Sequence, residues 1–413
     1  MVSKKSYLFI IIFIILSILI FVFKDYLKHE LLTSFPPEIQ EAIHVARHPE
    51  TINNLENDFN VNFLPNTQFI DLNYYHVDLK YDVPTNLANN FSLEDYQIDI
   101  YKDLVYLVNK IGIVKQFILT SDQGTIKVAE NKNISSNLNN LNIGKLLDLL
   151  VNNEYLYISY IVETPTCDLL KISRAKLNIN PLYFEEIYEP DRCIGVLPAT
   201  TMKFYKHNNK DGILLTSGNI LESIHLAQDP QSTMGKILFL DLSSYKASNF
   251  TTGHRNPQGL LIFNDIIIST EHGPRGGDEI NKIEYNTNYG WPISSYGEPY
   301  EMTSLPVYDK NHELNNFKEP IFSFIPSIGI SEIINLPNSF SKNWQNNFLM
   351  ASLKNESLYR IRFDSKFSRV IYMERIFIGE MIRDIKYYSK LNIILLTEIN
   401  RNGKMGILSV KKN

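Results

Sequence analysis

Three segments within forty residues hold the side chains best suited to chemistry. They are Gly253–Leu260 (GHRNPQGL), Glu271–Asn281 (EHGPRGGDEIN) and Asn288–Pro292 (NYGWP). Glycine and proline interrupt strands and expose backbone carbonyls, and a loop arginine can bind a carboxylate through two hydrogen bonds. Carbonyls beside carboxylates suit Ca²⁺. The segments therefore predict a site for an anion and a hard cation, although turn chemistry alone also explains their Gly, Pro and Asn.

The elements that must position these loops are short strands. After about residue 66 the chain consists of short apolar or alternating runs, such as 155–162, 236–242, 266–270 and 393–398, separated by Asn, Asp, Gly and Pro. Such runs indicate strands, with one short helix expected at Ile143–Leu150. Closely spaced strands are typical of a sandwich, a barrel or a propeller, and a chain this long favours a propeller of four-stranded blades. The fold class is all-β, without a clear internal sequence repeat.

The order of these segments resembles the soluble glucose/sorbosone (aldose sugar) dehydrogenase family, which depends on pyrroloquinoline quinone (PQQ). The similarity is strongest over about residues 211–300 and also includes Ala227–Pro230 and Gly235–Leu238. It continues more weakly through Pro326–Ile328, Ala351–Lys354 and Ile382–Asp384. The resemblance implies a six-bladed β-propeller that uses PQQ and Ca²⁺ to oxidise a hydroxyl of a sugar or related alcohol. Electrons would pass to the quinone and then to a respiratory acceptor.

The same resemblance implies particular site residues. The expected contacts to PQQ are Arg255, Asn256, Lys354 and Arg383. The backbone carbonyls of Gly273 and Pro274 would bind the calcium at the cofactor, and Glu279 and Tyr289 would bind a second, structural calcium. Cations around the carboxylates suit an anionic quinone, and Ca²⁺ stabilises charge on its reduced form. His254 and His272 are expected mainly to orient their loops.

Three positions depart from the family pattern. Leu197 stands where the family has its histidine general base, Asn219 where it has an acidic residue, and Met381 where it has a further arginine. Removing a proton from a sugar hydroxyl needs a base, so no catalytic residue is assigned. Turnover is expected to be slow, shifted in substrate or absent. The alternative function is a catalytically impaired propeller that binds a glycan or a protein.

The N-terminus predicts a membrane anchor. Lys4 and Lys5 precede an apolar run from Tyr7 to Phe23, which as a helix would extend roughly 25 Å and just cross a bilayer. A cleaved signal peptide and a buried core helix are the alternatives. Residues 1–24 are therefore interpreted as a single transmembrane helix, 25–65 as a stem and 66–413 as a propeller. The lysine pair favours a cytoplasmic N-terminus, which places the propeller in the periplasm or another extracytoplasmic space.

Charge and cysteine content set two further bounds. The net charge of −5 without a long basic run argues against nucleic acid as a partner. Cys167 and Cys193 are the only cysteines. They form either a disulfide, which an extracytoplasmic domain permits, or two unrelated thiols.

Overall fold

The computed structural model describes residues 70–79, 96–109, 112–122, 124–164, 168–190, 199–219, 224–299, 308–399 and 403–411. The predicted anchor and stem (1–65), Leu197 and the Cys167–Cys193 pair lie outside these ranges and stay predictions. Within these ranges, no helix has the length and apolar character needed to span a bilayer.

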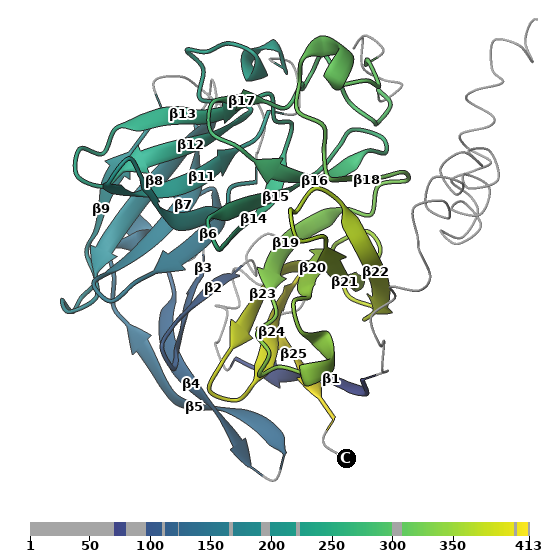
Figure 1. Ribbon diagram of the computed structural model, residues 1–413. Helices are drawn as coiled ribbons and strands as arrows, with labels where there is room; N and C mark the ends of the chain where they lie inside the picture. Colours follow the sequence, from purple (N-terminus) through teal and green to yellow (C-terminus); the bar gives the residue numbers. More distant parts are fainter. Residues whose placement is uncertain are drawn as a thin grey trace, which may run out of the picture. The chain divides into compact units, whose positions relative to one another are not determined.

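Six antiparallel sheets, here called blades 1 to 6, form the described chain (Figure 1). Blade 1 contains β2 (Tyr96–Tyr101), β3 (Leu104–Asn109), β4 (Val114–Asp122) and β5 (Thr125–Ile134). Blade 2 contains β6 (Lys145–Val151), β7 (Tyr155–Glu163), β8 (Asp168–Lys176) and β9 (Phe184–Tyr188). Blade 3 contains β10 (Met202–His207), β11 (Lys210–Ser217), β12 (Lys236–Asp241) and β13 (Ala247–Thr252), with β17 (Thr287–Asn288) added in parallel.

The second half of the chain repeats this plan. Blade 4 contains β14 (Pro257–Phe263), β15 (Ile266–Glu271), β16 (Asp278–Ile283) and β18 (Phe322–Phe324). Blade 5 contains β19 (Ile330–Asn335), β20 (Phe348–Ser352), β21 (Ser357–Phe363) and β22 (Val370–Phe377). Blade 6 contains β23 (Ile382–Tyr388), β24 (Ile393–Glu398), β25 (Lys404–Val410) and β1 (Leu72–Asp78). Short 3₁₀ turns also lie between the described strands, namely η2 (Leu138–Asn140), η3 (Ile224–Ala227), η4 (Glu313–Asn315) and η5 (Lys342–Trp344).

The blades close into a ring. The first strands of consecutive blades, β2, β6, β10, β14, β19 and β23, contact one another in a circle that returns to β2. The circle is sealed by β1, which comes from the N-terminal side of blade 1 but pairs with β25, for example His76 opposite Gly406. This arrangement confirms the predicted all-β, six-bladed propeller.

Local sequence explains the individual hairpins. Asn208 and Asn209 join β10 to β11 with φ of 49° and 62°, and Asn264 and Asp265 join β14 to β15 with φ of 47° and 66°. Two consecutive residues with positive φ are the requirement of a type I′ turn, which Asn and Asp tolerate. The expected helix at 143–150 is wrong, because this segment forms the inner strand β6. Its apolar run is short enough to serve either element, and burial between two blades selected the strand.

Apolar side chains fill the spaces between adjacent blades. Between blades 6 and 1, Ile98 and Leu107 pack with Leu395 and Ile407, and all four are essentially buried. Similar clusters join each further pair of neighbours. Each fully buried Leu or Ile contributes about 1.5–3 kcal/mol, so the ring holds the loops at its ends in fixed positions.

Candidate functional site

The loops singled out from the sequence meet at one end of the propeller. The loop before β14 carries Arg255 and Asn256, and the loop after β15 carries His272. The backbone N–H of His272 donates to the Asn256 carbonyl at 3.0 Å, and Arg255 Nη1 donates to the His272 carbonyl at 3.0 Å. The two loops therefore form one surface, as predicted.

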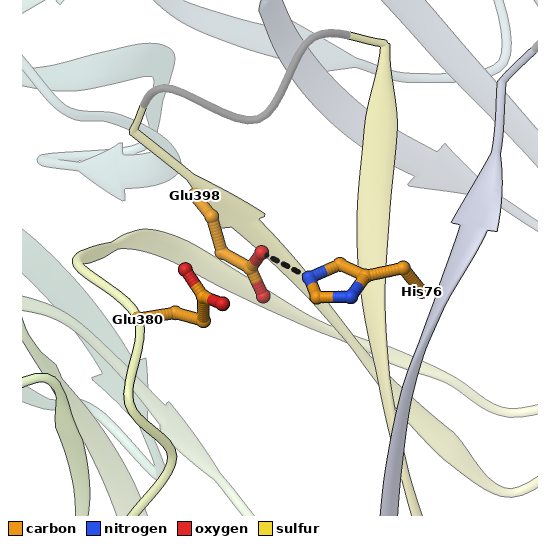
Figure 2. A group of neighbouring side chains, drawn as sticks. All are labelled: His76, Glu380 and Glu398. Carbon is orange, nitrogen blue, oxygen red and sulfur yellow. Dashed lines mark hydrogen bonds and ion pairs between the residues drawn. The ribbon is translucent and has the colours of Figure 1, made fainter.

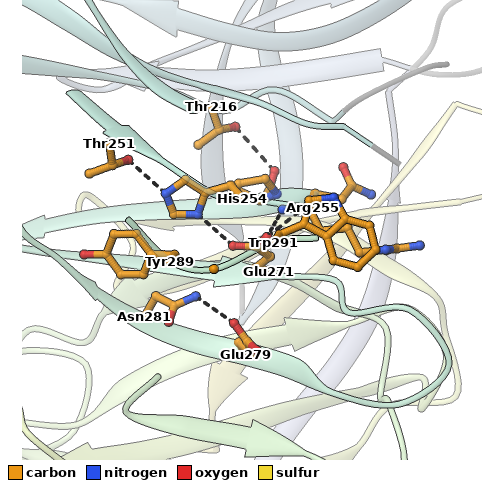
Figure 3. A network of polar contacts seen from close by, with 12 residues as sticks. Thr216, Thr251, His254, Arg255, Glu271, Glu279, Asn281, Tyr289 and Trp291 are labelled. Atoms are coloured by element: carbon orange, nitrogen blue, oxygen red, sulfur yellow. Dashed lines mark hydrogen bonds and ion pairs between the residues drawn. The ribbon is translucent and has the colours of Figure 1, made fainter. Parts of the chain in front are cut away.

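A buried carboxylate fixes the conformation of the Arg255 loop. Glu271 accepts the backbone N–H groups of Arg255 and Asn256, the second at 3.2 Å. It also bonds to His254 Nδ1 at 2.9 Å, and His254 Nε2 contacts Thr251 Oγ1 at 2.8 Å. Figure 3 shows Glu271 between His254 and Arg255. His254 thus orients the loop, as expected, and its ring stacks on Tyr289 with centroids 4.6 Å apart.

A second cation approaches from blade 6. Arg383, at the start of β23, donates through Nη1 to Gln258 Oε1 at 2.6 Å. Asn256 Oδ1 accepts the backbone N–H of Ala199 at 3.1 Å. Gln258, Ala199 and Arg383 line a cavity of about 260 Å³ near the propeller axis, together with Asp148, Glu332, Asp384 and Glu398. Side chains from several blades therefore converge at this end of the axis.

His272 lies between the two arginines. Burial lowers the pKa of its imidazole, and the positive charges of Arg383 and Arg255 lower it further, although Asp278 opposes them. Its Nε2 is buried without a hydrogen-bond partner among the described residues. A neutral imidazole with one such nitrogen, flanked by two guanidinium groups, is a setting that suits a planar anion.

Lys354 lies on a loop that hydrogen bonds fix at the same end of the propeller as Arg255 and His272. Its backbone N–H donates to the Ile328 carbonyl at 3.1 Å, and its side chain is exposed. Asp278 holds this neighbourhood together by accepting three consecutive backbone N–H groups, from Ile328 at 3.1 Å, Gly329 at 2.7 Å and Ile330 at 3.1 Å. The other Asp278 oxygen accepts the Gly273 N–H at 3.1 Å. One aspartate thus positions the Lys354 loop against the predicted calcium turn.

Most of the predicted calcium ligands surround a small cavity. Gly273, Glu279 and Tyr289 line a space of about 10 Å³, with Glu271, Ser294, Ser295 and His312. Pro274 follows Gly273 in the chain and packs against Gly297. The cavity has the size of about one water molecule or ion. The oxygen atoms of Glu271, Glu279, Ser294 and Ser295 fit Ca²⁺, whereas Arg255, His272 and His312 also line the space.

The electrostatics of this small cavity also favour a cation. Burial raises the pKa of Glu279 well above its usual range, and the neighbouring charge of Glu271 adds to the shift. Two buried carboxylates facing one space repel each other, and a divalent cation would relieve that repulsion. The Tyr289 hydroxyl donates to the Lys282 carbonyl at 2.7 Å and accepts the Glu284 N–H at 2.9 Å. Any contribution of Tyr289 to an ion therefore falls to its backbone carbonyl.

Two of the three departures from the family pattern, Asn219 and Met381, lie within the described residues. Asn219 is buried, its N–H donates to the Arg255 carbonyl at 2.5 Å, and its carbonyl accepts Trp291 Nε1 at 2.9 Å. Met381 is half-buried beside β24, where its carbonyl accepts the Ile399 N–H at 3.0 Å. Asn219 therefore holds Arg255 in place, whatever its role in proton transfer.

The sequence interpretation did not assign roles to Gln258, Glu271 and Asp278. All three lie within or beside the motifs, but their positions in the sequence do not show what they contact. Gln258 is hydrogen-bonded to Arg383, which lies 125 residues later in the sequence. Asp278 is hydrogen-bonded to the 328–330 loop, which lies about 50 residues later. Of the three, only Glu271 has a role that its neighbouring sequence could indicate, because a carboxylate that ends a strand beside a glycine turn can accept backbone N–H groups.

Comparison with known proteins gives a family assignment. The family described as Glucose / Sorbosone dehydrogenase matches residues 111–408. The aldose sugar dehydrogenase YliI of Escherichia coli (strain K12) is 28% identical over 177 residues, which cover 39% of this chain and 47% of that protein.

Solved structures show the same fold. The apo-form of the soluble aldose sugar dehydrogenase from Escherichia coli superposes with a TM-score of 0.61 at 18% identity, covering 83% of this chain and all of that chain. The PQQ-bound form of the aldose sugar dehydrogenase from Streptomyces coelicolor superposes with a TM-score of 0.55 at 14% identity, covering 84% of this chain and all of that chain. At these identities the likeness concerns the fold alone.

Proposed function

The chain belongs to the glucose/sorbosone dehydrogenase family, and from this premise we propose that it is a PQQ- and Ca²⁺-dependent dehydrogenase acting on a hydroxyl of a sugar or related alcohol. The observation that carries the proposal is that Arg255 and Arg383, from blades 4 and 6, both approach His272 at the end of the propeller where Arg383 lines the axial cavity. A structural neighbour was solved with PQQ bound.

The residues of this chain fit an anionic, planar cofactor. Arg255 and Arg383 would bind its carboxylates in charge-assisted hydrogen bonds, with Lys354 as a third cation. Asn256 and the Nε2 atom of His272 would orient its polar edge. When bound, the quinone would supply the oxidising chemistry by accepting two electrons from the sugar. The backbone carbonyls of Gly273 and Pro274 would hold the calcium at the cofactor, and Glu279 and Tyr289 would hold a second, structural calcium. The small cavity that Gly273, Glu279 and Tyr289 line supports a cation in this neighbourhood.

Turnover is proposed to be limited by proton transfer. Asn219 is an amide at the family's acidic position, and it is already bonded through its backbone to Arg255 and Trp291. An amide cannot accept a proton at neutral pH, and Leu197 lacks a titratable group. Loss of a general base typically costs ~10²–10⁴ in rate. Weak activity is therefore expected, and a glycan- or protein-binding propeller is the second candidate function, favoured by these two residues.

The proposal includes a location. Residues 1–24 would anchor the protein in the membrane, with the propeller in the periplasm or an equivalent compartment. From there, electrons could reach a respiratory acceptor in the same membrane. A propeller restricted to the cytoplasm in a protease-accessibility assay on spheroplasts would contradict this part.

Calorimetric titration of the full-length protein with PQQ, in the presence of Ca²⁺, tests the function. Saturable binding is expected, with a loss of at least ~10-fold in affinity in Arg255→Ala and in Arg383→Ala, because each removes a carboxylate partner. The matched control is Arg369→Ala, which removes an exposed arginine from the turn between β21 and β22 at the opposite end. The absence of PQQ binding in the wild-type protein would reject the enzyme and leave the binding propeller.

A rescue experiment tests the proton-transfer part separately. Combining Leu197→His with Asn219→Asp should raise the rate of sugar-dependent dye reduction while PQQ affinity stays within a few-fold. If PQQ binds and the double variant is no faster, the missing base is not what limits turnover.

A further inference from the structure

A cluster at the margin of the axial cavity, which Glu398 also lines, brings together three potential metal ligands that are not among the predicted PQQ and calcium contacts. His76 lies on β1, Glu398 at the end of β24, and Glu380 in the loop between β22 and β23. One ligand atom from each lies within 4.8 Å of the other two. Figure 2 shows the three side chains pointing toward a common point. The β23–β24 hairpin brings Glu380 near Glu398, and closure of the ring by β1 adds His76.

Contacts with His76 and Tyr74 hold Glu398, the buried member of the cluster, in position. The Glu398 side chain is fully buried, whereas the His76 side chain is 25% exposed. His76 Nε2 lies 2.7 Å from Glu398 Oε2, and the Tyr74 hydroxyl donates to Glu398 Oε1. A side chain at Gly406 would collide with this carboxylate, because an added Cβ would lie 2.2 Å from Glu398 Oε1. A glycine therefore makes the space. The Tyr74 hydroxyl, which also lies 3.0 Å from His76 Nε2, orients both ligands, as hydrogen-bonding groups around the ligands do at metal sites.

The donor set indicates which class of ion would bind. One imidazole nitrogen and two carboxylates suit Zn²⁺ and similar transition ions, whereas Ca²⁺ prefers oxygen ligands alone. Ligand atoms around a tetrahedral Zn²⁺ with bonds of ~2.0–2.1 Å lie about 3.3 Å apart. An ion would therefore widen the 2.7 Å separation of His76 Nε2 and Glu398 Oε2 slightly. It would draw in Glu380, whose ligand atom lies within 4.8 Å of the other two, by movement of its long side chain. The exposed edge of His76 gives an ion a route of entry.

We propose that His76, Glu380 and Glu398 form a binding site for a divalent transition-metal ion, with Zn²⁺ as the fitting probe. The ion would join the closing strand β1 to β24 and to the loop that leads into β23. That loop places Glu380 three residues before Arg383, so metal binding would stiffen the seam of the ring and the approach to the axial cavity. The inference stands on its own geometry and does not depend on PQQ binding.

The competing interpretation is a plain His76–Glu398 ion pair with Glu380 as a bystander. Glu380→Gln separates the two, because it removes one ligand and leaves the His76–Glu398 contact unchanged. Tyr74→Phe is a second, conservative variant that removes only the hydroxyl in contact with both Glu398 Oε1 and His76 Nε2. His207→Ala is the matched control, because His207 lies within aromatic side chains of blades 3 and 4 rather than carboxylates.

The test is equilibrium dialysis of the chelator-treated, full-length protein against Zn²⁺, with Ca²⁺ saturating throughout. The wild-type protein and His207→Ala should each bind one equivalent of Zn²⁺ with the same affinity. His76→Ala and Glu380→Gln should bind this ion more than ~100-fold more weakly, and Tyr74→Phe ~10–100-fold more weakly. Zn²⁺ should also raise the melting temperature of the wild-type protein but not that of Glu380→Gln. Equal Zn²⁺ binding by the wild-type protein and Glu380→Gln, or no binding by the wild-type protein, would overturn the site.

Discussion

At the scale of single residues, buried carboxylates hold the loops of the site in position. Glu271 fixes the backbone of Arg255 and Asn256, Asp278 joins two loops, and Glu279 faces the small cavity. A buried carboxylate is costly unless hydrogen bonds or cations satisfy it. Glu271 and Asp278 are satisfied by backbone N–H groups, which makes Glu279 the carboxylate that most needs an ion.

Removing calcium should therefore weaken the fold through Glu279. A chelator is expected to lower the melting temperature, because a ligand bound only by the folded state stabilises it. Glu279→Gln should melt at nearly the same temperature with and without Ca²⁺, since it lacks the repelling charge. Glu313→Gln, on the short η4 turn, should respond like the wild-type protein. Differential scanning calorimetry with and without chelator measures the effect, and an unchanged wild-type melting curve would reject the calcium site.

At the scale of elements, a buried lysine joins β12 to the loop that precedes it. Lys236 has no exposed surface, and its Nζ donates to the carbonyls of Leu226 at 2.9 Å, Ala227 at 2.7 Å and Met234 at 2.9 Å. The Ala227 carbonyl also accepts the Gly253 N–H at 3.1 Å. The lysine thus connects a strand, the η3 turn and the start of the Arg255 loop, a role that its place in the sequence does not indicate.

Lys236→Met should destabilise the protein by about 2–4 kcal/mol. The substitution keeps a long apolar chain but leaves three buried carbonyls without this donor, and each such loss costs about 1–3 kcal/mol with partial relaxation. Lys127→Met is the control, because Lys127 forms an exposed ion pair with Asp122, and such pairs contribute about 0–1 kcal/mol. Urea unfolding compares the two variants. Equal small effects would show that the Lys236 contacts are dispensable.

At the scale of the whole molecule, closure of the ring concentrates charge on the axis. The inner strands bring Asp99, Asp148, Glu332 and Asp384 together with Lys203 and Lys386. Asp148 accepts the backbone N–H of Leu149 at 2.8 Å and of Met202, on the neighbouring blade, at 2.6 Å. Burial raises the pKa of Asp148 to about 7, against the opposing charges of Lys386 and Lys203.

This shift predicts a pH dependence of stability. Between about pH 4 and pH 7 the folded protein holds a proton on Asp148 that the unfolded chain has released, so the free energy of unfolding falls as pH rises through this window. The difference between the wild-type protein and Asp148→Asn should follow that fall and become constant above about pH 8. Asp211→Asn, on an exposed hairpin, should show no such trend. Urea titrations from pH 4 to 8.5 supply the measurement, and a flat difference would contradict the shift.

The closing strand makes a further prediction at this scale. A chain beginning at residue 66 should fold, whereas one beginning at residue 80 loses β1 and leaves β25 as an open edge. It also loses Val77 and Leu79 from the core between blades 6 and 1, each worth about 1.5–3 kcal/mol. The shorter chain should lack a cooperative melting transition in near-ultraviolet circular dichroism. Identical transitions for both chains would show that the ring closes without β1.

The sequence alone determined the family, the all-β class and the end of the fold that carries the site. These follow from contiguous features, since motif order, strand-length apolar runs and turn residues such as Asn208–Asn209 act over a few residues. Tertiary structure decided which distant residues contact each other, such as His76 and Glu398, which are 322 residues apart in the sequence. It also made 143–150 a strand rather than a helix. A run of apolar residues does not encode which blade it will pack against. That choice is settled only when six sheets close on one another and bury both faces of each.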